Sequence, residues 1–455
     1  MMTEVVAGPV RQKVESGGGL DRQAAERLAD GAPEWLRRRR LDAWATYEAT
    51  PMPTTRLEEW RYTDLAARLP LDRLRLPAGE PLPDDPETWP ELLRRAMAED
   101  PDASGHIVLV DGCVVHADID PSLAARGVVL GSLRDAVDQH GDLLDRHLAT
   151  DAVPATEGKL QALNAALWTD GVLLYVPRGV LLEHPVRVTR WYSEAGAAYF
   201  SRTLIVAEPT SQVSFVDEVL SDDLAEPTLT SSAVEVIARD GARVQYVSVQ
   251  RMGRGAFHQS AQRTLAGRDA TLDTLNVSLG ATTTRVDLNA RLLGPGAESN
   301  MLGLYFGDGD QHFDHNTSQD HVAPSAKSDL LYKGALDGDS RAVFRGIIRV
   351  AKGAHGTDAY QTNRNLLLSD RARADSLPNL EIEADDVKCS HGASVGQLDA
   401  EAIFYLMSRG MSRGQAERLV VLGFLGDVLQ RLPLGGVSEK VTRVIEEKLR
   451  SEAHG

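Results

Sequence analysis

Cys389 and His391 are the two residues of this sequence whose types and spacing most clearly allow chemistry. They lie in a segment, residues 380–396, whose first half alternates apolar and acidic residues as a β-strand does. Because strand side chains repeat every two residues, we expect the thiol and the imidazole on one face, a few ångströms apart. This pair predicts a site for soft-metal or sulfur chemistry. The competing interpretation is a buried cysteine beside a hydrogen-bonded histidine, and two side chains alone cannot complete a tetrahedral metal site.

A second polar cluster follows the turn at residues 307–309. Within ten residues it holds three imidazoles and two carboxylates: His312, Asp314, His315, Asp320 and His321. Side chains of these types so close together resemble metal ligands. We take His312, Asp314, His315 and His321 as a secondary candidate metal site. Their spacing matches no zinc motif, and exposed polar residues in a loop would look the same.

Two common catalytic signatures do not occur in the sequence. It has no G-x4-G-K-[ST] loop to cradle phosphates and no H-E-x-x-H zinc motif. Any nucleotide hydrolysis associated with this chain is therefore expected from a partner.

The chain of 455 residues is too long for one hydrophobic core, so we expect two or three domains. Residues 1–20 lack the apolar core of a secretory signal and are expected to form a disordered leader. The longest uncharged apolar run, residues 419–426, is far shorter than the roughly 18 residues that span a membrane.

The only cysteines, Cys113 and Cys389, suggest no disulfide framework. The sequence therefore predicts a protein of the reducing cytoplasm without a transmembrane segment.

The charge balance argues against nucleic acid as a partner. The net charge is −17 and the isoelectric point is about 5.2, whereas polyanion binding needs clustered basic groups. The one exception is the run of four arginines at residues 37–40, which we interpret as the solvated face of a helix.

Helical patterns mark both ends of the sequence. The expected N-terminal helices cover residues 33–48, 57–69, 86–98 and 132–150, and a short hairpin is expected at 107–115. The expected C-terminal helices cover residues 399–408, 412–432 and 437–449. The helix at 412–432 is apolar around most of its circumference, so we expect it to be buried in a core or by a partner.

Between residues 171 and 395 short β-branched runs alternate with turns. Three of these turns carry an alanine at matching positions, Ala242, Ala270 and Ala297, which are 28 and 27 residues apart. A repeat of this length without helices predicts stacked β-coils, that is a β-solenoid or β-helix. A β-sandwich is the alternative, because the repeat fades after Gly309. We therefore predict a mainly β fold, with a mostly helical region at 1–155, a β-helix core at 156–396 and a C-terminal helical domain at 397–455.

The segment 332–424 carries motifs that resemble the SufB/SufD family of the Suf iron–sulfur cluster assembly machinery. They are RAVF at 341–344, TD at 357–358, QTNRNLLL at 361–368, LEI at 380–382, ADDVKCSHGA at 384–393, IFYL at 403–406 and SRG at 408–410. EEWRYT at 58–63 is similar to an N-terminal signature of the same family. The resemblance covers most of the chain. It implies a β-helix core between helical ends, in agreement with the solenoid pattern.

Within this family the chain resembles the SufD branch more than the SufB branch. By this resemblance, Asn363 stands where SufB proteins carry a scaffold cysteine, and Gly392 stands where they follow the shared histidine with an acidic residue. The resemblance implies that His391 is contributed to a nascent cluster at a heterodimer interface, with Cys389 as a redox-active or supporting thiol. Together with a thiolate and a carboxylate from SufB, His391 would give mixed coordination that is labile enough to release the cluster.

The resemblance also implies partners and cofactors. A SufB-like paralogue would form a heterodimer with this chain, which would assist iron acquisition, and the isolated chain could form a homodimer. A SufC-like ATPase would dock on the C-terminal helices, at Leu419, Val420, Phe424, Leu425 and Val428. This chain itself would be a non-catalytic scaffold subunit that binds no nucleotide, no nucleic acid and no membrane. The expected cofactor is a transient iron–sulfur cluster, or iron, shared with SufB, and the resemblance leaves a flavin open.

Three alternative functions stay open on sequence grounds. The chain could be a purely structural adaptor of the same complex, with no ligand role, or a SufB-like scaffold. It could also be a carbohydrate-active β-helix enzyme, which would need paired carboxylates in a cleft and aromatic platforms for sugars. Aromatic residues make up only 5% of the sequence, which argues against the enzyme.

Overall fold

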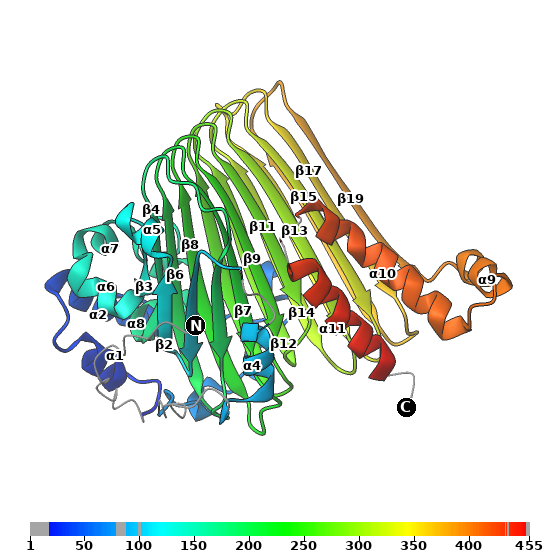
Figure 1. Ribbon diagram of the computed structural model, residues 1–455, viewed down its shortest axis with the longest axis horizontal. Helices are drawn as coiled ribbons and strands as arrows, with labels where there is room; N and C mark the ends of the chain where they lie inside the picture. Colours follow the sequence, from blue (N-terminus) through cyan, green and yellow to red (C-terminus); the bar gives the residue numbers. More distant parts are fainter. Residues whose placement is uncertain (1–17, 79–87, 99–101, 433, 435, 452–455) are drawn as a thin grey trace.

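The computed structural model describes residues 18–78, 88–98, 102–432, 434 and 436–451. Residues 1–17, which hold most of the expected leader, lie outside the described residues. In the described part of the chain, two long β-sheets form the body of the molecule, and helices from both ends of the sequence pack on it (Figure 1).

Successive strands alternate between the two sheets, so most strands pair with the strand two positions later in the chain. In spatial order, the ten-stranded sheet contains β19 (Lys388–Gln397), β17 (Asp358–Leu367), β15 (Lys327–Leu336), β13 (Glu298–Gly307), β11 (Thr271–Ser278), β9 (Arg243–Arg251), β7 (Gln212–Leu220), β5 (Val186–Trp191), β1 (Gly105–Val110) and β2 (Cys113–Ile119). The nine-stranded sheet contains β18 (Arg373–Ile382), β16 (Arg341–Val350), β14 (His312–His321), β12 (Thr283–Leu292), β10 (Ala256–Ala266), β8 (Thr228–Ala238), β6 (Ala198–Ala207), β4 (Asp170–Val176) and β3 (Val129–Ser132). Among these named strands only the pairs β1–β2 and β3–β4 are antiparallel.

This winding is the β-solenoid that the alanine repeat predicts. Ala242, Ala270 and Ala297 are fully buried, and Ala326, 29 residues after Ala297, occupies the same position in the next coil. The coils also continue where the sequence repeat fades, with Glu298 opposite Lys327, Lys327 opposite Asp358, and Asp358 opposite Lys388. The parallel pairing continues although the coils become slightly longer, so the β-sandwich alternative is wrong.

The N-terminal helices cover the outer face of the nine-stranded sheet near its β4 end. Apolar residues of six of these helices share one core cluster with Phe200, Leu229 and Ile237 of the sheet. The helices up to the first long strands are α1 (Arg22–Ala29), α2 (Glu34–Ala49), α3 (Leu65–Arg68), α4 (Glu91–Ala98), α5 (Pro121–Ala125), α6 (Leu133–Gln139), α7 (Gly141–His147) and α8 (Lys159–Leu167). The short 3-10 helices η1 (Glu58–Trp60), η2 (Leu71–Arg73) and η4 (Ala155–Glu157) lie between them.

Some of the expected N-terminal elements are interrupted. The helix at 33–48 and the hairpin at 107–115 are present as α2 and as β1 with β2. The helix at 57–69 breaks into η1 and α3, and the helix at 132–150 divides into α6 and α7 because His140 leaves the helical conformation. Of the helix at 86–98 the structure shows α4, while residues 86–87 lie outside the described residues.

The run of arginines at 37–40 is only half solvated, in contrast to our interpretation from the sequence. Arg37 and Arg38 are exposed. Arg39 donates to the carboxylate of Asp145, and the buried Arg40 donates to backbone carbonyls at the end of α8. The inner half of the run therefore ties α2 to its neighbouring helices.

Two C-terminal helices, α10 (Arg413–Arg431) and α11 (Val437–Ser451), cover the outer face of the ten-stranded sheet. Ser412 caps α10 through a capping box with Gln415. The preceding helix, α9 (Ala400–Ser408), projects away from the body of the molecule (Figure 1). No helix within the described residues has both the length and the apolar character of a membrane span.

Candidate functional site

The last coil of the solenoid is open. β18 and β19 are the edge strands of the two sheets, because no other strand in the described chain pairs along their free edges. Leu380 and Ile382 lie beside the buried Ile348 and Val350 of the preceding coil, yet they are 36% and 41% exposed. Val395 of β19 is similarly 45% exposed. Such an apolar strand edge is a template for association with another β-structure.

Cys389 and His391 lie on the inward-facing side of β19, in this open coil. Their neighbours in β17 are Ala359 and Gln361, which are 2% and 1% exposed. Cys389 is half-buried against a small apolar cluster that includes Ala359, whereas His391 is exposed. Burial, with a smaller contribution from the charge of Asp358, raises the pKa of the Cys389 thiol. The strand thus places the thiol and the imidazole on one face. A partner that docks on this coil could contact the imidazole directly.

In the part of the chain that the structure describes, no third ligand lies beside this pair. Within the described residues, no three histidine, cysteine or carboxylate side chains lie close enough together to hold a metal ion. Asn363 is a buried residue of β17, and its amide donates to the hydroxyl of Tyr305 at 3.2 Å and to the carbonyl of Tyr332 at 3.3 Å. A metal bound at His391 would therefore need further ligands from another chain.

Residues 392–396 match the pattern G-x-S-x-G, which in hydrolases places a nucleophilic serine on a sharp strand-to-helix turn. Here the whole pattern lies inside β19. Ser394 is therefore a residue of a regular strand and lacks the geometry of a nucleophile elbow.

The secondary candidate metal site does not come together. All of its residues lie in β14, and strand alternation sends His312 and Asp314 to the outer face and His315 and His321 to the interior. His315 and His321 are each hydrogen-bonded to a serine hydroxyl, at 3.1 and 2.8 Å. Burial lowers the pKa of His312, His315 and His321 to about 4 in each case. These imidazoles are neutral parts of the packing, on two faces of one strand.

His312 and Asp314 instead anchor an N-terminal segment, residues 55–63, which we call the strap. The fully buried Thr63 donates its hydroxyl proton to Asp314 at 2.6 Å and lies 2.8 Å from Nε2 of His312. Because this hydroxyl has a single proton, Nε2 of His312 must be the donor to Thr63. Trp60 adds a second anchor, since the guanidinium of Arg285 lies 3.8 Å from the centre of its ring. This link was not predicted from the sequence, although the EEWRYT motif at 58–63 contains one half of it.

The surface at which we expected an ATPase to dock is partly buried by the chain itself. Leu425 and Val428 are 1% and 0% exposed and pack against the outer face of the ten-stranded sheet. Phe424 and Val420 are partly buried, and Leu419 is 47% exposed. Leu425 and Val428 therefore cannot contact a partner, because the sheet and the neighbouring helix already cover them.

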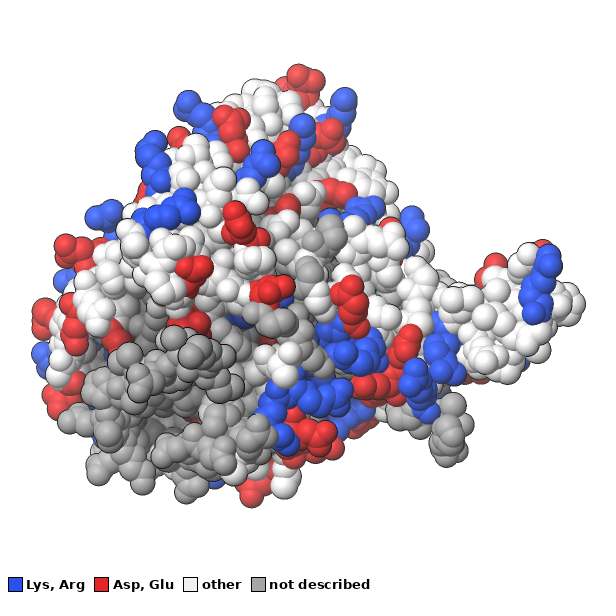
Figure 2. All heavy atoms as spheres, in the orientation of Figure 1, with Lys and Arg blue, Asp and Glu red and all other residues white. Residues whose placement is uncertain are grey.

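The free apolar surface lies on α9. Phe404, Tyr405 and Met407 are 72%, 56% and 43% exposed, and only Ile403 of this helix is buried. Figure 2 shows that the projecting end of the molecule carries few charged side chains. A group of exposed aromatic residues of this kind typically marks an interaction surface.

Two protein-family models match the chain over most of its length. The model of the SufBD core domain of SUF system FeS cluster assembly matches residues 190–424, which span the solenoid from the end of β5 to α10. The model of the SufBD protein N-terminal region matches residues 101–188.

Curated relatives agree with these models. The iron–sulfur cluster assembly protein SufD of Bacillus subtilis is 32% identical over 422 residues, which cover 92% of this chain and 95% of the relative. A SufBD family iron–sulfur cluster assembly protein of Mycobacterium tuberculosis is 34% identical over 67% of this chain and 77% of its own length. One from Staphylococcus saprophyticus is 26% identical over 88% of this chain and 87% of its own. The chain therefore belongs to the SufBD family of iron–sulfur cluster assembly proteins and is SufD-like.

Proposed function

We propose that the chain is a non-catalytic scaffold subunit of a cytoplasmic iron–sulfur cluster assembly complex, with a SufB-like paralogue and a SufC-like ATPase as partners. The observation that carries this proposal is the exposed imidazole of His391 on the inward-facing side of an open terminal coil. A paralogous solenoid docked on this coil would bury His391 at the junction without any change of its strand.

The chemistry of the pair suits a shared and transient cluster. His391 would supply one imidazole nitrogen to iron, and the paralogue would supply the sulfur and oxygen ligands that this chain lacks. The raised pKa of Cys389 keeps its thiol protonated at neutral pH, so we assign it a supporting or redox role in iron acquisition rather than that of a resident ligand. The apolar side chains of the open coil would exclude water from the junction.

The ATPase is proposed to bind at α9 and at the adjoining exposed residue of α10, Leu419. Of the docking residues that we expected, this proposal keeps Leu419 and leaves out the buried Leu425 and Val428. ATP hydrolysis is assigned to the partner, because the chain has no phosphate-binding loop.

His391→Ala tests the proposed ligand role. The complex of this variant with both partners should form in normal yield, because the side chain is exposed and makes no core contact. Bound iron and labile sulfide, measured after reconstitution, should fall to a small fraction of those of the unchanged complex. Ser390→Ala is the matched control, since Ser390 is an exposed neighbour on the opposite face of the same strand.

A His391→Ala complex that holds iron and sulfide at the level of the Ser390→Ala control would refute the ligand role. The chain would then be a structural adaptor that completes the complex. Failure of His391→Ala to join the complex at all would instead assign His391 to association.

A further inference from the structure

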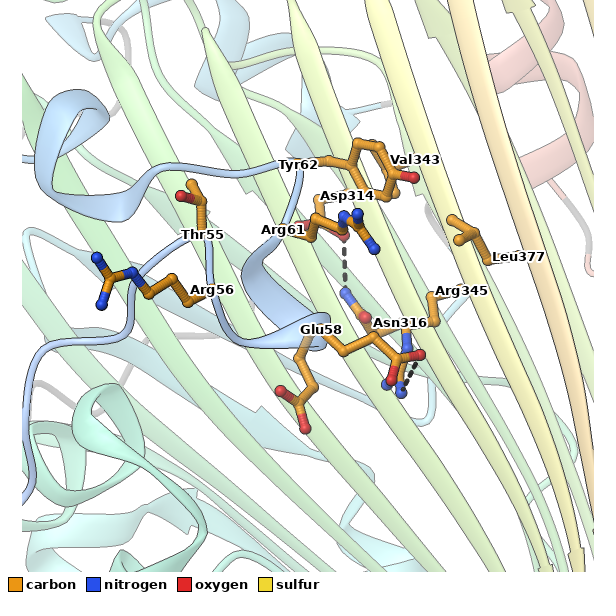
Figure 3. Close-up of a pocket in the computed structure, with 11 residues that line it drawn as sticks. Thr55, Arg56, Glu58, Arg61, Tyr62, Asp314, Asn316, Val343, Arg345 and Leu377 are labelled. Carbon is orange, nitrogen blue, oxygen red and sulfur yellow. Dashed lines mark hydrogen bonds and ion pairs between the residues drawn. The ribbon is translucent and has the colours of Figure 1, made fainter.

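A pocket lies between the strap and the outer face of the nine-stranded sheet, away from the open inner face of the terminal coil. It has a volume of about 470 Å³, which is within the usual range for small-molecule sites. Figure 3 shows its lining side chains gathered from the strap and from strands β14, β16 and β18. They include Arg56, Arg61, Tyr62, Asn316, Val343, Arg345 and Leu377.

The pocket is already formed in the chain, because the strap above it is held at three points. Thr63 is bound to His312 and Asp314, and Trp60 is covered by Arg285. The ring of Tyr62 lies 5.3 Å from the guanidinium of Arg341. A ligand would therefore meet a fixed wall and would not have to order the strap first.

The basic groups of the pocket have unused hydrogen-bonding capacity. Arg56 and Arg61 are exposed, and among the described residues their guanidinium groups have neither an ion-pair partner nor a hydrogen-bond partner. Arg345 donates from Nη2 to Glu58 at 3.2 Å. An anionic ligand at these guanidinium groups would form charge-assisted hydrogen bonds, which are stronger than those between neutral groups.

The acidic groups of the pocket are either engaged with other residues or exposed, so the arginine donors stay available to a ligand. Asp314 already accepts from Arg285 and Thr63. Glu58 and Glu59 are exposed, and the pair of Glu58 with Arg345 is a surface ion pair of small free energy. A ligand anion can therefore take the place of Glu58 at Arg345 at little cost.

The rest of the floor is apolar and flat. Val343 is 3% exposed, and Leu377 and the ring of Tyr62 are partly buried beside it. We propose that this pocket binds a small organic anion, with a phosphate or carboxylate on Arg61 and Arg345 and a flat apolar body against Tyr62, Val343 and Leu377.

Equilibrium binding of 4-methylumbelliferyl phosphate to the full chain, followed by fluorescence anisotropy, tests this site. We expect saturable binding of one probe per chain. Arg61→Gln and Arg345→Gln should each weaken binding roughly tenfold or more, because each removes a charge-assisted hydrogen bond. Arg349→Gln is the matched control, since Arg349 is on the same face of β16, is paired with a glutamate and lies outside the pocket. It should bind the probe as the unchanged chain does.

Two further probes separate the parts of the proposed ligand. Inorganic phosphate should bind more weakly than the aromatic phosphate, and so should uncharged 4-methylumbelliferone. The proposal is overturned if the aromatic phosphate shows no saturable binding. It is equally overturned if Arg61→Gln and Arg345→Gln, both folded by circular dichroism, bind like the Arg349→Gln control. Equal affinity for all three probes would refute the assignment of an anionic head and an apolar body. None of these outcomes depends on partners or on His391.

Discussion

The two residues of the candidate site share a strand face but differ in environment. Cys389 packs against the apolar cluster beneath the last coil, whereas His391, two residues further along the strand, is exposed to solvent. A buried thiol favours its neutral form, and the nearby carboxylate of Asp358 adds to this preference. The pair therefore combines an accessible imidazole with a thiol that reacts less readily than a free one.

We expect Cys389 to be alkylated slowly by iodoacetamide at neutral pH, because only the thiolate reacts and its pKa is raised. The alkylation rate at this peptide, followed by mass spectrometry against pH, should reach half its maximum at a higher pH than a thiol in a short peptide. Asp358→Asn should move this midpoint downward, since it removes the second cause of the shift. A midpoint at or below that of the model peptide would contradict the assignment.

Residue types and spacing were enough to identify Cys389 and His391, because period-2 geometry holds in any strand. They were not enough for His312 and its neighbours, for which the same reasoning predicted a cluster. Those residues form a strand whose two faces separate the side chains, and the partner of His312 is Thr63, 249 residues away in sequence. A local motif cannot disclose a partner at that distance.

At the scale of the elements, α10 and α9 differ in what covers their apolar residues. α10 was expected to be buried in a core or by a partner and to dock an ATPase, and it buries Leu425 and Val428 against the ten-stranded sheet. α9 keeps its aromatic residues exposed because it projects beyond the sheet. An apolar pattern predicts that a helix face is covered, but it does not say whether the chain itself or a partner covers it.

Phe404→Ala and Tyr405→Ala together should weaken binding of the SufC-like ATPase roughly tenfold or more, as expected for central aromatic residues of an interface. The measurement is the dissociation constant by surface plasmon resonance. Alanine preserves helix propensity, and neither side chain is buried, so the variant should unfold at the same denaturant concentration as the unchanged chain. Leu293→Ala, at an exposed apolar residue after β12, is the control. An unchanged dissociation constant would place the ATPase elsewhere.

Inside the solenoid, strands also fit together in ways that the sequence does not reveal. A Cβ atom at Gly334 would lie 1.8 Å from the ring of Tyr305, and one at Gly303 would lie 2.3 Å from the ring of Tyr332. Each glycine thus makes room for an aromatic ring from the neighbouring coil. The sequence shows glycines in strands, but only the register of β13 with β15 explains why they are there.

For the molecule as a whole, the fold class could be predicted from the sequence because a solenoid repeats its own geometry. Ala242, Ala270 and Ala297 reveal the period as long as the turn position keeps one residue type. The later coils are slightly longer and have Thr357 in that position, so the repeat is lost to inspection although the register continues. The open end could not be predicted, since it depends on which coil is last.

Because the terminal coil is uncovered, changes to its exposed apolar residues should affect assembly with a partner. Ile382→Lys and Val395→Lys each place a charge on the inward-facing surface of the terminal coil, where a docked paralogue would have to bury it. Each change should weaken association with the SufB-like paralogue at least about tenfold in analytical ultracentrifugation. The isolated variants should stay within roughly 0.5 kcal/mol of the original stability, because both side chains are already largely exposed.

Leu181→Lys is the control for this experiment, because Leu181 is an apolar residue with 53% exposure that lies far from the terminal coil in the solenoid. Its variant should associate normally. If Ile382→Lys and Val395→Lys also associate normally, the paralogue does not cover the terminal coil, and His391 would have no second chain to complete its ligands. If they lose association while His391→Ala keeps it, the coil provides the contact and the imidazole provides the chemistry.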